Sequence, residues 1–150
     1  EALTIFFDAI SASGAVCSDL PLPTQLYALA QRLRNLRQMT DQDLLQTVVD
    51  FSSCHLGALP HFPEVDTKSN LWPNVLVDLL ESADLSADKV KENQVKLRTL
   101  VSRRNDIAHG KSDMISEVAY YLTFEKVVYD VMYDLAFQID HRLSIPPYSA

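Results

Sequence analysis

One stretch decides how we interpret this chain: Ser102-Arg103-Arg104-Asn105-Asp106-Ile107-Ala108-His109-Gly110. It closes an amphipathic segment that begins near Ser86, a residue type that caps helix N-termini, and Gly110 stands where a glycine commonly ends a helix. Asp88, in the first turn, complements the positive end of the helix dipole. The pattern therefore predicts one helix from residue 87 to residue 109.

At about 100° per residue, the apolar side chains of this helix share one face. The face consists of Val90, Leu97, Leu100, Val101, Ile107 and Ala108. Arg104 falls inside it, while Asn105 and His109 stack on one edge, on the flank that also carries Lys91 and Arg98. Because a guanidinium stays charged, an arginine that faces a core needs a partner or a wet cleft. Two explanations stay open: a structural ion pair with a carboxylate, or a functional site.

Basic side chains concentrate around the same helix. Between Lys89 and Lys111 there are seven Lys or Arg residues against two Asp or Glu, a net charge of +5. Since the whole chain carries −7, the remaining residues carry −12. This total argues against a nonspecific nucleic-acid coat, whereas a basic patch on an acidic protein fits local contact with a phosphate backbone. A solvated helix face with ordinary lysines explains the same charges equally well.

Residues Arg104 to His109 resemble the R-x4-H signature of the HEPN superfamily, including the polar residue that usually follows the arginine. The surrounding order of a long basic helix, a polar loop and a long C-terminal amphipathic helix spans about residues 70–143. This order is similar to the bacterial toxin and defence branches of that superfamily. The resemblance implies an all-α fold, an up-and-down bundle of about five helices, with residues 1–150 as one domain.

The resemblance also implies a homodimer in which two motifs face each other and cut RNA without a metal or another cofactor. Such cleavage deprotonates the ribose 2′-OH, protonates the leaving 5′-oxygen and neutralises charge on the phosphate. We expect His109 to transfer protons, Arg104 to clamp the phosphate, and Asn105 to orient the imidazole or the phosphate. The basic patch supplies the expected RNA contacts: Lys91, Arg98, Arg103 and Lys111.

Helix geometry makes the second subunit a mechanistic requirement. Arg104 and His109 are about 140° apart around the helix axis, so one motif alone can hardly bring both side chains to a single phosphate.

An antitoxin or another defence-system protein is a further expected partner. One position departs from the pattern: in HEPN toxins silenced by nucleotidyltransferase antitoxins a tyrosine follows the histidine by two residues, and here Lys111 stands there. The alternative function is a noncatalytic HEPN interaction module that can bind RNA.

Composition limits the class of protein. A chain of 150 residues with 47% hydrophobic residues can bury a core without disulfides or metals. Cys17 and Cys54 are far apart in the sequence, which fits structural thiols in a reducing cytoplasm. No apolar run approaches the roughly 18 residues of a membrane span, and no basic start precedes an apolar segment. We expect a cytoplasmic protein without a membrane partner, and a longer N-terminal segment ahead of Glu1.

The remaining pattern predicts further helices and argues against a metal site. A helix over residues 24–39 would be capped by Thr24, and Thr40 with Asp43 resembles a capping box that opens the next one. Pro73 fits the first turn of a short helix, and a last helix is expected at about residues 123–143. The connection between residues 60 and 70 is expected to be a loop.

The spacing of Cys54, His55 and His61 matches no zinc pattern.

Overall fold

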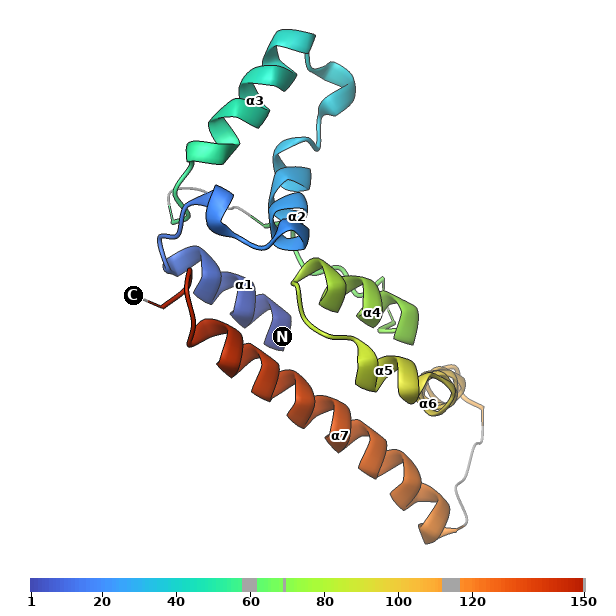
Figure 1. Cartoon of the computed structure of the whole chain (residues 1–150). Coiled ribbons are helices and arrows are strands. Elements are labelled where there is room, and N and C mark those ends of the chain that lie inside the picture. Colours follow the sequence, from blue (N-terminus) through green and yellow to red (C-terminus); the bar gives the residue numbers. More distant parts are fainter. Residues whose placement is uncertain (58–61, 69, 112–116, 150) are drawn as a thin grey trace. The chain divides into compact units, whose positions relative to one another are not determined.

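A computed structural model describes residues 1–57, 62–68, 70–111 and 117–149 (Figure 1). Across these residues the regular structure is helical, which confirms the all-α class, and β pairing is limited to one isolated bridge between Val16 and His55. The α-helices are α1 (Ala2–Ala12), α2 (Leu22–Arg32), α3 (Asp41–Ser53), α4 (Pro73–Ser82), α5 (Asp88–Glu92), α6 (Gln94–Ala108) and α7 (Val118–Leu143). Two short 3-10 helices are η1 (Cys17–Asp19) and η2 (Leu36–Gln38).

The chain divides into two compact units. Unit 1 comprises residues 1–65, 82–84 and 139–150, and unit 2 comprises residues 66–81 and 85–138. Helices α1 to α3 therefore belong to unit 1. Nearly all of α4, the whole of α5 and α6, and most of α7 belong to unit 2. Within the described residues, none of the helices has the length and apolar composition that crossing a membrane requires.

Unit 1 is built around the apolar side of α1. Phe6 and Ile10 are fully buried, and the ring of Phe7 packs against Tyr27 and Phe62, with centroids 5.0 and 4.8 Å away. Burying an aromatic side chain removes a large apolar area from water, so this cluster contributes strongly to the stability of unit 1.

Two helix boundaries in unit 1 test the sequence patterns. The capping box at the start of α3 is confirmed: the Thr40 hydroxyl accepts from the Asp43 amide, and the Asp43 carboxylate accepts from the Thr40 amide. The helix predicted over residues 24–39 was wrong at both ends. It starts at Leu22 and ends at Arg32, with η2 following as a separate turn, and Thr24 is buried inside the helix rather than capping it.

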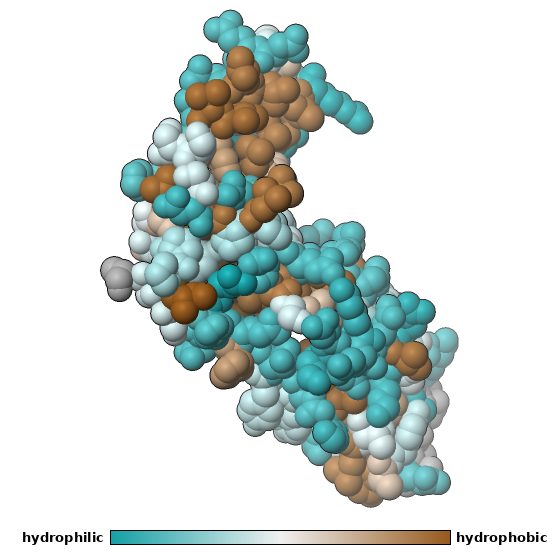
Figure 2. All heavy atoms as spheres, viewed as in Figure 1, coloured by the Kyte–Doolittle hydropathy of each residue, from teal (hydrophilic) through white to brown (hydrophobic). Residues whose placement is uncertain are grey.

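An apolar surface remains on α3. Leu45, Val48 and Val49 are exposed there. Figure 2 shows hydrophobic side chains gathered over this helix. Unit 1 thus combines a packed aromatic core with an exposed apolar patch on α3.

Unit 2 carries the motif. Its helix α4 begins at Pro73, as predicted, because a proline at the first helical position lacks only an amide that would have no partner. The last helix begins at Val118, five residues before the predicted start, and among its 26 residues Phe124 and Val127 are buried. The core of unit 2 is formed by the buried residues Val75, Leu79, Leu80, Leu85, Ala87, Val90, Phe124 and Val127.

Candidate functional site

The helix that carries the motif is shorter than predicted. Asn93 separates α5 from α6, and its side-chain amide donates to the Lys89 carbonyl at 3.0 Å. The single helix over residues 87–109 was therefore wrong, because an asparagine side chain can bond to nearby backbone and compete with helix continuation. Ser86 still contributes at the start of α5: its hydroxyl accepts from the Asp88 amide at 3.1 Å. Lys91 lies on α5, so it does not share one helix with Asn105 and His109.

The C-terminal end of α6 is confirmed. Gly110 has φ +80°, its amide donates to the Ile107 carbonyl at 3.0 Å, and the Lys111 amide donates to the Asp106 carbonyl at 2.9 Å. These two bonds form a Schellman motif, which favours glycine at the left-handed position. His109 is the C-cap residue, so the glycine that ends the helix also places the motif histidine at the helix C-terminus.

The part of the predicted core-facing stripe that lies on α6 is not buried, whereas Val90, on α5, is. No residue of α6, all of which is described, is buried; Leu97, Leu100 and Val101 are half-buried, and Ile107 is 57% exposed. Helix periodicity correctly aligns these side chains but does not determine what covers them. The apolar face of α6 therefore remains largely open to solvent in the single chain.

Arg104 lies on this open face beside a cavity. Its side chain is exposed, and its Nη1 donates to Asn70 Oδ1 at 2.9 Å and to Asn105 Oδ1 at 3.3 Å. The cavity, of ≈ 370 Å³, is lined by Thr67, Asn70, Leu71, Leu100, Val101 and Arg104. Among the described residues, the hydrogen-bond partners of Arg104 are thus neutral side-chain amides, and the arginine lines an open cavity. The ion-pair explanation requires a carboxylate at this place.

The other two motif residues lie on a different side of the helix. Asn105 is half-buried and contacts Arg104, as given above, while His109 is exposed. One described hydrogen bond joins His109 to Asn105, and it joins their backbones: the His109 amide donates to the Asn105 carbonyl at 2.9 Å. Within one chain, α6 therefore presents the guanidinium and the imidazole at separate places on its surface.

Two of the four expected RNA-contacting cations form ion pairs. Lys91 Nζ lies 2.7 Å from Glu81 Oε1, and Lys111 Nζ lies 2.7 Å from Asp106 Oδ1. The hydrogen bond and charge of each carboxylate raise the pKa of the lysine above its ordinary value. All four side chains are exposed, so the pairs are screened by water and hold the lysines weakly.

The two expected arginine contacts differ from each other. The Arg103 guanidinium lies over the Tyr120 ring, 5.5 Å from its centroid, a cation–π arrangement. Arg98 is exposed on α6, and the structure shows no ion pair between it and any described carboxylate. Of the four cations, Arg98 therefore presents its charge most openly.

Sequence reasoning missed Asn70 and Tyr120 as neighbours of the motif. Both contacts join residues that are distant in the sequence, one from the segment before α4 and one from the first turn of α7. No periodicity or spacing connects them to Arg104 or Arg103. The sequence gives one weak indication of a role for Asn70, because it is a polar residue at the end of the predicted loop.

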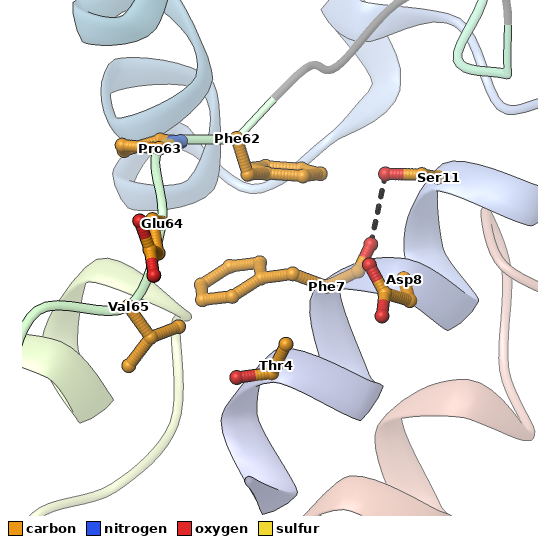
Figure 3. A pocket seen from close by; sticks show the side chains of 8 residues that line it. All are labelled: Thr4, Phe7, Asp8, Ser11, Phe62, Pro63, Glu64 and Val65. Carbon is orange, nitrogen blue, oxygen red and sulfur yellow. Dashed lines mark hydrogen bonds between the residues drawn. The ribbon is translucent and has the colours of Figure 1, made fainter.

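A second cavity lies in unit 1, and none of its lining residues belongs to the motif. It has a volume of ≈ 160 Å³ and is lined by Thr4, Phe7, Asp8, Ser11, Phe62, Pro63, Glu64 and Val65 (Figure 3). The rings of Phe7 and Phe62 face each other in Figure 3, and the Ser11 hydroxyl donates to the Phe7 carbonyl at 2.9 Å. Because the Phe7 and Phe62 rings pack on each other, the packed faces cannot stack on a ligand.

No cluster of three or more metal-ligating residues occurs among the described residues, and His61 lies outside them.

Comparison with known proteins agrees with the motif. Searches of curated proteins and of solved structures found no significant match. A family model described as HEPN_MAE_28990-like HEPN matches residues 1–148, a range that includes Arg104, Asn105 and His109. The match spans nearly the whole chain, and its helical class agrees with the fold described above. The chain therefore belongs to the HEPN superfamily, in the HEPN_MAE_28990-like HEPN family.

Proposed function

We propose that this protein is a metal-independent endoribonuclease that acts as a homodimer, as a toxin or phage-defence effector in the bacterial cytoplasm. One observation carries the proposal: in a HEPN chain, the motif arginine is exposed beside an open cavity and bonded to amides rather than to a carboxylate. An uncompensated guanidinium in a cleft is suited to bind a phosphate.

Arg104 serves as the phosphate clamp. Both of its hydrogen bonds to described residues leave from Nη1, so Nη2 and Nε have no described acceptor, and the side chain lines the cavity. Two parallel N–H donors match two phosphate oxygens and neutralise charge as it develops in the transition state. Asn70 and Asn105 position the guanidinium without reducing its charge.

His109 serves as the proton-transfer residue. An imidazole exchanges protons near neutral pH, which suits both a base toward the 2′-OH and an acid toward the leaving 5′-oxygen. The same imidazole serves the two roles in turn, because the proton that it takes from the 2′-OH is then available for the leaving 5′-oxygen. The product carries a 2′,3′-cyclic phosphate, since the attacking oxygen belongs to the ribose itself.

A second copy of the chain brings the separated groups together. Arg104 and His109 are about 140° apart on α6, so a composite site uses the arginine of one subunit with the histidine of the other. Unit 2 offers an apolar surface for this contact. A groove of ≈ 400 Å³ is lined by Leu100, Tyr121, Phe124, Glu125, Val128, Tyr129 and Met132. Exposed apolar side chains such as Tyr121, Tyr129 and Met132 are of the kind that protein interfaces cover.

The basic side chains around the motif hold the RNA backbone. Arg98 and Arg103 contact phosphates directly, while Lys91 and Lys111 exchange their carboxylate partners for phosphates. This exchange is inexpensive because exposed ion pairs contribute only about 0–1 kcal/mol. Binding should therefore weaken steeply as salt is raised.

A second candidate is a noncatalytic HEPN module that binds a partner protein. The ion pairs of Lys91 and Lys111 favour it, because they leave fewer free positive charges for RNA. An antitoxin or another defence-system protein is the kind of partner that this module would bind.

Incubation with total RNA separates the two candidates. We expect cleavage that continues in EDTA, leaves 2′,3′-cyclic ends and stops on a substrate whose scissile ribose lacks its 2′-OH. His109→Ala should lower the rate by at least about 100-fold with unchanged helical signal, because general acid–base catalysis contributes about that much or more. His141→Ala, another exposed histidine near a helix C-terminus, is the matched control and should cleave normally.

Two results would contradict the ribonuclease. If chelation abolished cleavage and a divalent ion restored it, the metal-free mechanism would be wrong. If the wild-type protein cleaved no RNA under any of these conditions, the interaction module would be favoured.

A further inference from the structure

Cys17 and Cys54 lie opposite each other in unit 1, although they are distant in the sequence. Val16 and His55 form an antiparallel bridge; the Cys17 amide donates to the Cys54 carbonyl at 2.8 Å and the Leu56 amide to the Ala15 carbonyl at 2.9 Å. Opposed residues of an antiparallel pair have Cα atoms about 4.5–5.5 Å apart. Disulfides span Cα distances of about 4.4–6.8 Å, so the backbone already suits a bond between these two thiols, both of which are free.

The two thiols have different surroundings. Cys17 is fully buried, and this burial, together with the neighbouring Cys54, raises its pKa to about 11. Cys54 is partly exposed just after α3, and Arg32 Nη2 donates to its sulfur at 2.7 Å. The Arg32 guanidinium also lies over the Phe51 ring, 5.2 Å from the centroid, which holds it in place. A cation beside a sulfur favours the thiolate, the nucleophile of thiol–disulfide exchange.

We propose that Cys54 and Cys17 form a dithiol modification site, in which Cys54 attacks a small-molecule disulfide and Cys17 then closes an intramolecular disulfide. The family assignment does not bear on this site, which lies in unit 1 and shares no residue with the motif. Its chemistry follows from the burial difference and from the Arg32 contact.

The exchange has two balanced steps. The Cys54 thiolate attacks one sulfur of the disulfide RSSR, a Cys54–SR bond forms, the S–S bond of RSSR breaks, and RS⁻ leaves. Cys17 then attacks the Cys54 sulfur, the Cys54–SR bond breaks, and the Cys17 proton passes to the departing RS⁻. Overall, two protein thiols lose two electrons and two protons, and RSSR is reduced to two RSH molecules.

The resulting bond would join the first residue of η1 to the residue that follows α3. A crosslink that closes a loop of this length restricts the unfolded chain strongly, so the oxidised protein should melt at a higher temperature than the reduced one. The site therefore adjusts the stability of unit 1 according to the disulfide content of its surroundings.

The test is incubation of the full chain with oxidised glutathione, followed by alkylation of free thiols and peptide mass mapping. We expect the wild type to yield a Cys17–Cys54 linked peptide, Cys17→Ala to accumulate a glutathione adduct on Cys54, and Cys54→Ala to remain unmodified. Arg32→Met, which keeps a side chain of similar length, should react at least about tenfold more slowly. Arg34→Met is the matched control and should react at the wild-type rate, because Arg34 is exposed and has no described bond to either cysteine.

Early time points in the wild type test the order of steps even if a cysteine variant does not fold. The Cys54 adduct must appear before the linked peptide. The proposal is wrong if the wild type keeps a lasting adduct on Cys54 with Cys17 still free. It is equally wrong if both thiols are alkylated after incubation, or if Arg32→Met reacts at the rate of Arg34→Met.

Discussion

The two units of the molecule bury their apolar side chains to different extents. In unit 1, α1 has 11 residues and buries Leu3, Phe6, Phe7 and Ile10. In unit 2, α6 has 15 residues and buries none, and the 26-residue α7 buries Phe124 and Val127. Because exposed apolar surface is costly in water, the difference indicates that α1 packs into the core of its unit, whereas α6 and α7 leave apolar surface that a partner can cover.

Removing a core ring should have the largest effect. Phe6→Ala deletes a fully buried ring, and we expect a loss of about 3–5 kcal/mol in the free energy of unfolding. Phe137→Ala, at a position 72% exposed on α7, removes the same atoms and should cost less than about 1 kcal/mol in dilute, monomeric protein. Urea denaturation measures both values. Equal losses would show that unit 2 is packed as tightly as unit 1.

A charge placed in the α7 groove should have a smaller but specific effect. Met132→Glu puts a carboxylate where a second copy would cover it, and we expect the dimer Kd to rise roughly 30- to 150-fold, equivalent to about 2–3 kcal/mol. Leu45→Glu makes the same change on the exposed apolar patch of α3. It should leave the dimer intact. Sedimentation velocity distinguishes the two, and the opposite pattern would assign the interface to α3.

Local sequence signals predicted three element ends correctly, although the cap predicted at Thr24 was wrong. The Thr40–Asp43 capping box, the Pro73 helix start and the Gly110 helix end each depend on backbone bonds within a few residues, so they are present in the sequence itself. The break at Asn93 was missed because the apolar spacing continues across it. Asparagine is common enough in helices that its type alone does not reveal a break.

Long-range features could not be predicted in the same way. The amide partner of Arg104 is Asn70, and the neighbour of Cys54 is Cys17; both pairs are formed by the path of the chain in space. Periodicity placed Arg104 on an apolar stripe, but whether that stripe is covered depends on what packs against it. The motif itself was recognisable, since R-x4-H is a short local pattern.

Mixing two inactive variants tests the shared site most directly. Arg104→Ala and His109→Ala should each be folded, dimeric and inactive toward RNA. When the two are unfolded together and refolded as a mixture, half of the dimers carry one variant of each kind, and one of their two composite sites keeps both an intact arginine and an intact histidine. We therefore predict recovery of about a quarter of the wild-type cleavage rate. No recovery from a mixture shown to contain heterodimers would contradict a site built from two subunits.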